Sequence, residues 1–315
     1  MRLLKLNDNG GFSLTSFSNK DIPKYAILSH TWGDANTEVT YTDLVDDTAS
    51  SKEGYQKLQF CGNQAKADGL HWFWVDTCCI DKSNNNELTK AINSMFRWYQ
   101  NAAKCYVYLS DVSAYTQDGR FEHLTWELAF YRSRWFTRGW TLQELLAPEI
   151  VEFYSRDNVR IGDKNSLLRQ IHEITGIADE ALQGCPLSQF SVNERLLWGE
   201  KRQTTEEEDK AYCLLGIFDI NMPLIYGERE ANAMRRLLRE INESTNTRSY
   251  LSGATLMTYL QCHRSILTSL DKNLPRVMPF ECSPLFTGRE SELEKLKKLL
   301  FQSRHITRIA LLTNS

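Results

Sequence analysis

Tyr25-Ala26-Ile27-Leu28 is a short, unbroken run of apolar residues near the start of this 315-residue chain. A continuous run, rather than one that alternates with polar residues, is typical of a strand buried on both faces. Comparable runs recur at Trp72-Phe73-Trp74-Val75 and at Cys105-Tyr106-Val107-Tyr108-Leu109, and a fourth, interrupted by Glu152, extends from Ile150 to Tyr154. The sequence therefore predicts four buried strands.

Helical patterns separate these strands. Apolar residues recur at helical spacing from Tyr55 to Asp68 and again, after a run of asparagines that can cap a helix, from Glu87 to about Ala102. A third, short helix is expected from about Gly139 to a stop near Pro148. Strand and helix in alternation predict an α/β fold with a parallel sheet flanked by helices. Residues 112–132 are expected to be an insertion, and the later part of the chain reads as a mostly helical C-terminal extension.

The composition excludes several classes of protein. The net charge is -3 with both signs interspersed, so no nucleic-acid surface is expected. No apolar run is long enough to span a bilayer, and residues 1–11 lack the apolar core of a secretory signal. The eight cysteines include no Cys-x-x-Cys pair, which argues against a structural zinc site and a disulfide framework. We therefore expect a cytoplasmic protein with no metal, no nucleic acid and no membrane among its partners.

Polar residues follow the predicted strands. Ser29 and His30 come after the first, Asp76 after the second, and Ser110-Asp111 after the third. Parallel sheets bind ligands outside the carboxyl ends of their strands, so these residues are candidates for one site. Polar residues after strands are also what any loop shows. His30 can equally be a structural hydrogen-bonding residue, and Asp76 can simply cap a turn.

The stretch from Ser133 to Pro148 carries the most specific chemical signal. Trp140 and Glu144 are four residues apart, so on a helix they share a face, and a carboxylate beside an indole can be kept dry and held in place. Such a carboxylate can face a developing cation. The alternative is that Trp135 and Trp140 are core residues and Glu144 is a surface charge or an ion-pair partner of Arg138.

Four blocks of this sequence together resemble a known family, the fungal heterokaryon-incompatibility (HET) domain, over residues 1–245. The blocks are YAILSHTWG at 25–33, WVDTCCIDK at 74–82, RGWTLQELLAP at 138–148, and DKAYCLLGIF at 209–218, which continues to YGE at 226–228. The resemblance implies a cell-death effector in self/non-self recognition and innate immunity that self-associates into a homo-oligomer. HET domains also resemble TIR domains in fold, which implies a TIR-like, flavodoxin-like sheet.

The TIR likeness also implies an activity. Enzymatic TIR domains carry a tryptophan with a catalytic glutamate four residues on, and they hydrolyse NAD; Trp140 and Glu144 match that spacing, although the insertion at 112–132 departs from a minimal TIR pattern. By this resemblance Glu144 is catalytic. The expected substrate contacts are Ser29, His30, Trp32, Asp76, Arg138 and Trp140. No cofactor is expected, and NAD would be the substrate of this NAD glycohydrolase.

The tail of the chain resembles something different. Residues 246–283 read as a linker with a helix, and Phe286-Thr287-Gly288-Arg289-Glu290 opens a segment, 284–315, that resembles the start of the nucleotide-binding domain of STAND/NACHT proteins. In that family a phosphate-binding loop with a Gly-Lys pair follows, and this sequence contains no Gly-Lys pair. We therefore expect a truncated start without the P-loop and without ATP hydrolysis, and related STAND/NLR proteins as possible partners.

A second hypothesis of function stays open. The domain can be a non-enzymatic signalling module that triggers cell death by homotypic assembly and partner recruitment. The two hypotheses differ in what should surround Glu144: a ligand edge with Trp140 nearby favours the enzyme, whereas a carboxylate with no pocket around it favours the assembly module.

Overall fold

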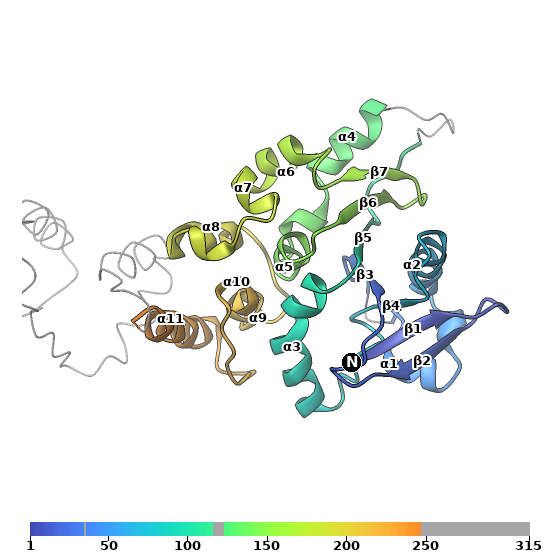
Figure 1. Ribbon diagram of the computed structural model, residues 1–315, viewed down its shortest axis with the longest axis horizontal. Helices are drawn as coiled ribbons and strands as arrows, with labels where there is room; N and C mark the ends of the chain where they lie inside the picture. The colour runs from blue at the N-terminus through green and yellow to red at the C-terminus, as the bar shows by residue number, and fades with distance from the viewer. Residues whose placement is uncertain (35, 116–122, 247–315) are drawn as a thin grey trace, which may run out of the picture. The chain divides into compact units, whose positions relative to one another are not determined.

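A computed structural model of the protein describes residues 1–34, 36–115 and 123–246 (Figure 1). Its centre is a seven-stranded sheet with the order β2-β1-β4-β3-β5-β6-β7. The strands are β1 (Arg2–Leu6), β2 (Phe12–Ser16), β3 (Tyr25–His30), β4 (Trp72–Trp74), β5 (Lys104–Leu109), β6 (Val151–Ser155) and β7 (Arg160–Asp163). The fold is therefore α/β, as the sequence predicts.

The four predicted strands form the parallel centre of the sheet. β3 is parallel to β4 on one side and to β5 on the other, and β5 is parallel to β6. The hairpin of β1 and β2 adds antiparallel to β4, and β7 adds antiparallel to β6. The sequence pattern does not predict these three outer strands. The order of the central four begins like that of a flavodoxin-like sheet, but an antiparallel strand follows them, so the TIR-like detail stays a prediction.

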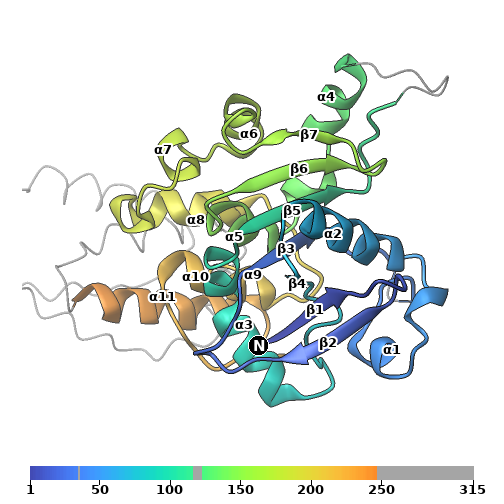
Figure 2. The same ribbon diagram turned by 45° about the vertical axis from the view of Figure 1, so that its right-hand side comes forward.

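Two long helices cover opposite faces of this sheet. α2 (Tyr55–Ala67) connects β3 to β4, and α3 (Asn85–Gln100) connects β4 to β5 on the far side of β3. Because parallel crossovers are right-handed and the two run in opposite directions across the sheet, the helices lie on opposite faces (Figure 2). Both helices were predicted. The side chain of Asn84 caps α3 through the backbone N–H groups of Asn86 and Glu87.

The remaining helices are shorter except for α11, which has 17 residues, and most of them follow in the second half of the chain. They are α1 (Tyr41–Val45), α4 (His123–Tyr131), α5 (Thr141–Leu146), α6 (Leu168–Thr175), α7 (Asp179–Leu182), α8 (Val192–Glu200), α9 (Asp209–Tyr212), α10 (Leu215–Phe218) and α11 (Glu230–Asn246), with 3₁₀ turns η1 (Ala49–Ser51), η2 (Arg134–Thr137) and η3 (Leu187–Gln189). The predicted insertion contains α4. The predicted linker at 246–283 and the NACHT-like segment at 284–315 lie outside the described residues.

The core is built on the central strands and is rich in aromatic side chains. Every residue of β3 is buried, and Trp135, Phe130 and Phe153 are wholly inaccessible to solvent. Phe153 of β6 lies in edge-to-face contact with both Trp135 and Phe130. Burying one such ring stabilises the fold by roughly 2–3 kcal/mol, so this cluster holds the segment before α5 firmly against the sheet. In the described part of the chain, no helix is long and apolar enough to cross a membrane.

Candidate functional site

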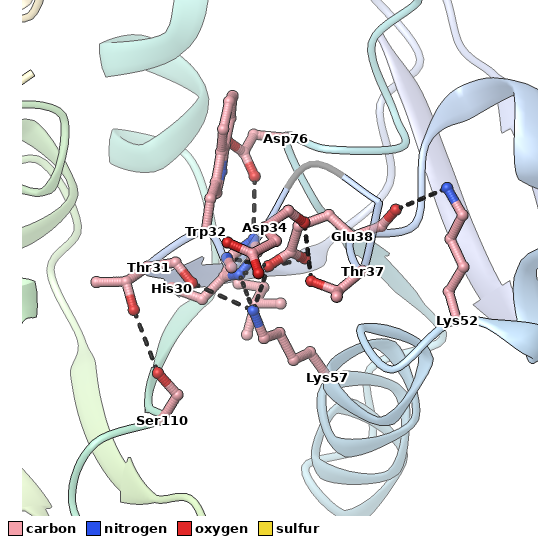
Figure 3. Close-up of polar contacts among 12 residues, drawn as sticks. His30, Thr31, Trp32, Asp34, Thr37, Glu38, Lys52, Lys57, Asp76 and Ser110 are labelled. Atoms are coloured by element: carbon pink, nitrogen blue, oxygen red, sulfur yellow. Dashed lines mark hydrogen bonds and ion pairs between the residues drawn. The ribbon is translucent and has the colours of Figure 1, made fainter. Parts of the chain in front are cut away.

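The loops after β3, β4 and β5 meet at the carboxyl edge of the parallel strands. Thr31 Oγ1, just after β3, lies 3.3 Å from Ser110 Oγ, just after β5 (Figure 3). On the other side of β3, the His30 ring lies 3.2 Å from Asp76, which follows β4. The chain passes from β3 to β4 on one side and then crosses back to β5 on the other side of β3. The carboxyl edge at β3 is therefore a topological switch point, where open α/β sheets bind ligands. Of the polar residues predicted to gather at one edge, His30 and Asp76 lie together there, and Ser110 lies beside Thr31.

Glu144 is deeply buried behind this edge. It lies on α5, with 5% of its surface exposed. Ser29 Oγ donates a hydrogen bond to Glu144 Oε2, and Trp135 Nε1 donates one of 2.8 Å to Ser29 Oγ. The indole linked to this carboxyl group, through the Ser29 hydroxyl, is therefore that of Trp135. The alternative that made Glu144 a surface charge is wrong, and no ion pair joins it to Arg138 in the described part of the chain.

Burial also sets the charge of Glu144. Removal from water raises the pKa of this carboxyl group to about 8, the negative charge of Asp76 adds to the effect, and the hydrogen bond from Ser29 opposes it. At neutral pH the group is therefore mostly protonated. A neutral carboxyl group does not stabilise a cation as a carboxylate does, so catalysis by Glu144 requires a change in its surroundings.

Trp140 and Arg138 are bonded to the second half of the chain instead. Trp140 is the residue immediately before α5, and its Nε1 donates a 2.9 Å hydrogen bond to Asp209. Arg138 Nη2 donates to Thr205 Oγ1 at 3.0 Å. Between them, the backbone of Gly139 approaches residues 203–204 so closely that a Cβ atom would clash with Thr204. Their polar groups therefore serve contacts with the helical extension, and a role in substrate binding stays a prediction.

Asp76 is the carboxyl group that stays ionised at this edge. It accepts a 3.2 Å hydrogen bond from His30 Nε2 and a 2.9 Å bond from Trp32 Nε1. Burial opposes its ionisation, but the His30 bond, the charge of Lys82 and the Trp32 bond outweigh burial and lower the pKa of Asp76. Trp32 is 46% exposed, and Lys82 Nζ lies 3.6 Å from the centre of its ring. A charged carboxylate and a half-exposed indole thus stand side by side.

Two further charged residues belong to this cluster and were not predicted from the sequence. Lys57 on α2 lies 3.3 Å from His30 Nδ1 and forms an ion pair with Glu38 (Figure 3). Glu38 also accepts the backbone N–H of Gly33 at 2.7 Å. A signal for Lys57 exists in the sequence: it stands four residues before Cys61, in the buried face of a helix, where a lysine is rare unless it is paired.

One hollow in the described residues lies at the opposite edge of the sheet. Its lining includes Leu6 of β1, Gly62 and Ala65 of α2, and His71 just before β4. A smaller one lies between α8 and α11 and includes Leu196 and Met234. Neither is lined by a predicted site residue. Within the described residues, no cluster of side chains offers a metal site either.

Comparison with known proteins agrees with the sequence blocks. Residues 25–129 match the family described as heterokaryon incompatibility protein (HET). The chain therefore carries a heterokaryon-incompatibility (HET) domain, and the resemblance seen in the sequence is confirmed. Over 244 residues, 77% of the chain, it is 57% identical to "Vegetative incompatibility protein HET-E-1" of Podospora anserina. The matched stretch spans 18% of that relative's length. No solved structure matches the chain.

Proposed function

We propose that this chain supplies a cell-death effector domain of fungal heterokaryon incompatibility. The observation that carries the proposal is the 57% identity to a vegetative incompatibility protein over 244 residues, together with the HET match at 25–129. The proposed place of action is the cytoplasm, in keeping with six free cysteines among the described residues. The proposed partners are further copies of the domain and related STAND/NLR proteins.

The first candidate mechanism is cleavage of NAD by a TIR-like glycohydrolase. It is supported by the gathering of Ser29, His30, Trp32 and Asp76 at the switch point, with Glu144 bonded to Ser29 behind them. Breaking the nicotinamide–ribose bond builds an oxocarbenium-like ribose, which a fixed carboxylate stabilises, and water then completes the hydrolysis. Nicotinamide leaves as a neutral molecule, so no general acid is needed. Glu144 has to be exposed and ionised for this step, and we propose that oligomerisation provides that change.

The second candidate mechanism is assembly without catalysis. The observation that favours it is the burial of Glu144, whose carboxyl group is mostly protonated at neutral pH and lines neither hollow. A protonated, hydrogen-bonded carboxyl group in the interior fits a structural role. For the conformation described, this observation weighs toward the assembly module.

One experiment separates the two mechanisms. The full chain is fused to an inducible dimerisation module, and NAD is followed by chromatography before and after clustering, beside Glu144→Gln and the exposed-site control Glu180→Gln. Loss of NAD that needs clustering, persists in Glu180→Gln and is absent from folded Glu144→Gln supports the enzyme. A clustered, folded parent that leaves NAD intact rules it out in favour of assembly. Expression of the clustered chain in a fungal host without cell death contradicts the effector proposal itself.

A further inference from the structure

Lys57 brings a buried positive charge to the carboxyl edge of the sheet. Its side chain is 10% exposed and that of His30 is 2% exposed. Lys57 Nζ lies 3.3 Å from His30 Nδ1, donates to the backbone oxygen of Thr31 at 3.2 Å, and pairs with Glu38. Figure 3 shows it reaching from α2 toward the imidazole ring. All of its hydrogen-bonding capacity is thus directed at the last residue of β3 and the segment that follows it.

This contact decides which nitrogen of His30 carries the proton. An ammonium group has only donors, so Nδ1 of His30 has to accept and is therefore unprotonated. In the neutral ring the proton then resides on Nε2, which faces Asp76 Oδ1 at 3.2 Å. The result is a relay in which Lys57 donates to His30 and His30 donates to Asp76. With both ring nitrogens engaged, His30 is not free to act as a base.

We propose that Lys57 is a positioning residue that holds His30 as its Nε2–H tautomer and thereby presents Asp76 as an ordered carboxylate at the ligand-facing edge. Asp76 accepts from Trp32 as well, so both of its oxygens are fixed. A ligand role for Asp76 rests on the proposed function, whereas the tautomer and the relay do not. The chemistry that such a carboxylate recognises is a ribose hydroxyl pair or another donor group.

Glu38 shows what the relay prevents. One of its oxygens accepts from Lys57 and from the backbone of Gly33, and the other, Oε2, is buried without a hydrogen-bond partner and lies 4.0 Å from His30 Nδ1. The charged groups facing His30 are thus Asp76, Glu38 and Lys57. Without Lys57, an N–H group at Nδ1 can donate a hydrogen bond to Glu38 Oε2. The Nε2–H tautomer of His30 is then no longer enforced.

The test reads the protonation of the ring nitrogens directly. The full chain is labelled with ¹⁵N-histidine, long-range ¹H–¹⁵N spectra are recorded at pH 7.5, and His30 is assigned among the six histidines from His30→Gln. The parent should show an unprotonated Nδ1 and a protonated Nε2. Lys57→Met should raise the fraction of rings protonated on Nδ1 about tenfold, because a hydrogen bond from a charged donor is lost. Lys57→Arg, which keeps a charged donor, should restore the parent pattern.

Lys52→Met is the matched control. Lys52 binds the same segment, through the Glu38 backbone oxygen at 3.1 Å (Figure 3) and the Asp43 carboxylate at 2.7 Å, and within the described residues it is not bonded to His30. The spectrum of Lys52→Met should match that of the parent.

A protonated Nδ1 in the parent overturns the proposal, and so does a folded Lys57→Met with the parent spectrum. If Lys57→Met does not fold, the parent and Lys57→Arg spectra still decide. If His30 has the Nε2–H tautomer but the clustered chain leaves NAD intact, the NAD mechanism is contradicted and the proposed relay still holds.

Discussion

Ser29 at the end of β3 donates a hydrogen bond to Glu144 of α5, 115 residues further along the chain. The same hydroxyl accepts the indole N–H of Trp135, so one small side chain joins the sheet, the segment before α5 and α5 itself. The residue expected to be catalytic is therefore also part of a buried polar connection. Mutations at this point should first be judged by what they do to folding.

Removing the Ser29 hydroxyl should destabilise the protein. In Ser29→Ala the Trp135 N–H and the Glu144 carboxyl group both lose a buried partner, which costs roughly 1–3 kcal/mol. The free energy of unfolding in urea at pH 7 measures the effect. Ser18→Ala, which loses an exposed bond to Asp21, should change stability by less than about 0.5 kcal/mol. Equal effects in the two variants would contradict the buried connection.

Glu144 should make stability fall as the pH rises. Its pKa is about 8 in the folded protein against an ordinary value of 4.5, so between these values the folded state holds a proton that the unfolded state has lost. Its stabilising contribution is complete below about pH 4.5 and is lost as the pH rises toward 8, with a slope of at most roughly 1.4 kcal/mol per pH unit.

Glu144→Gln isolates this effect, because the amide keeps the shape of the protonated acid and does not titrate. Relative to the parent, the variant should gain stability steadily from pH 5 to pH 8 in urea unfolding experiments. Glu180→Gln, at an exposed site, should run parallel to the parent. A difference between Glu144→Gln and the parent that is constant over this range would show that Glu144 is ionised in the folded protein.

Gly216 should not tolerate a side chain. It lies in α10, and a Cβ atom there would clash with Phe96 of α3. Gly216→Ala should therefore cost about 1–3 kcal/mol of unfolding free energy, since the two helices have to move apart. The control Gly11→Ala places its Cβ in ordinary contact with Asn9 and should be close to neutral. Wild-type stability in Gly216→Ala would show that α10 does not pack on α3 as described.

The Trp140–Asp209 bond should appear as an energetic coupling. Asp209 accepts from Trp140 Nε1 and from the hydroxyl of Tyr226 at 3.0 Å. In a double-mutant cycle, Trp140→Phe and Asp209→Ala should be coupled by about 1 kcal/mol in unfolding experiments. Tyr131→Phe, whose hydroxyl binds Glu173 elsewhere, should be additive with Asp209→Ala. Additivity of the first pair would release Trp140 for the substrate role predicted from the family.

The central strands could be predicted because burial on both faces leaves a continuous apolar run. β1, β2 and β7 could not, since these outer strands are partly exposed; β1 reads Arg2-Leu3-Leu4-Lys5-Leu6, with only two of its residues buried. Ser29, His30 and Asp76 followed from the rule that ligands bind beyond parallel strands. Lys57 and Glu38 did not, because their pairing is tertiary. Helical spacing likewise could not predict the partner of Trp140, because Asp209, to which its indole donates, lies 69 residues further along the chain.

The sheet order bears on how this domain should be cut for study. The family match covers residues 25–129. Within the sheet, however, β4 pairs with β1, which precedes that span, and β5 pairs with β6, which follows it. A fragment trimmed to the match would hold three strands with both outer backbones bare, the geometry that recruits other chains edge to edge. Clustering or toxicity of such a fragment would reflect its unpaired strand edges and not a property of the intact domain. Assays of self-association therefore need both flanking segments in place.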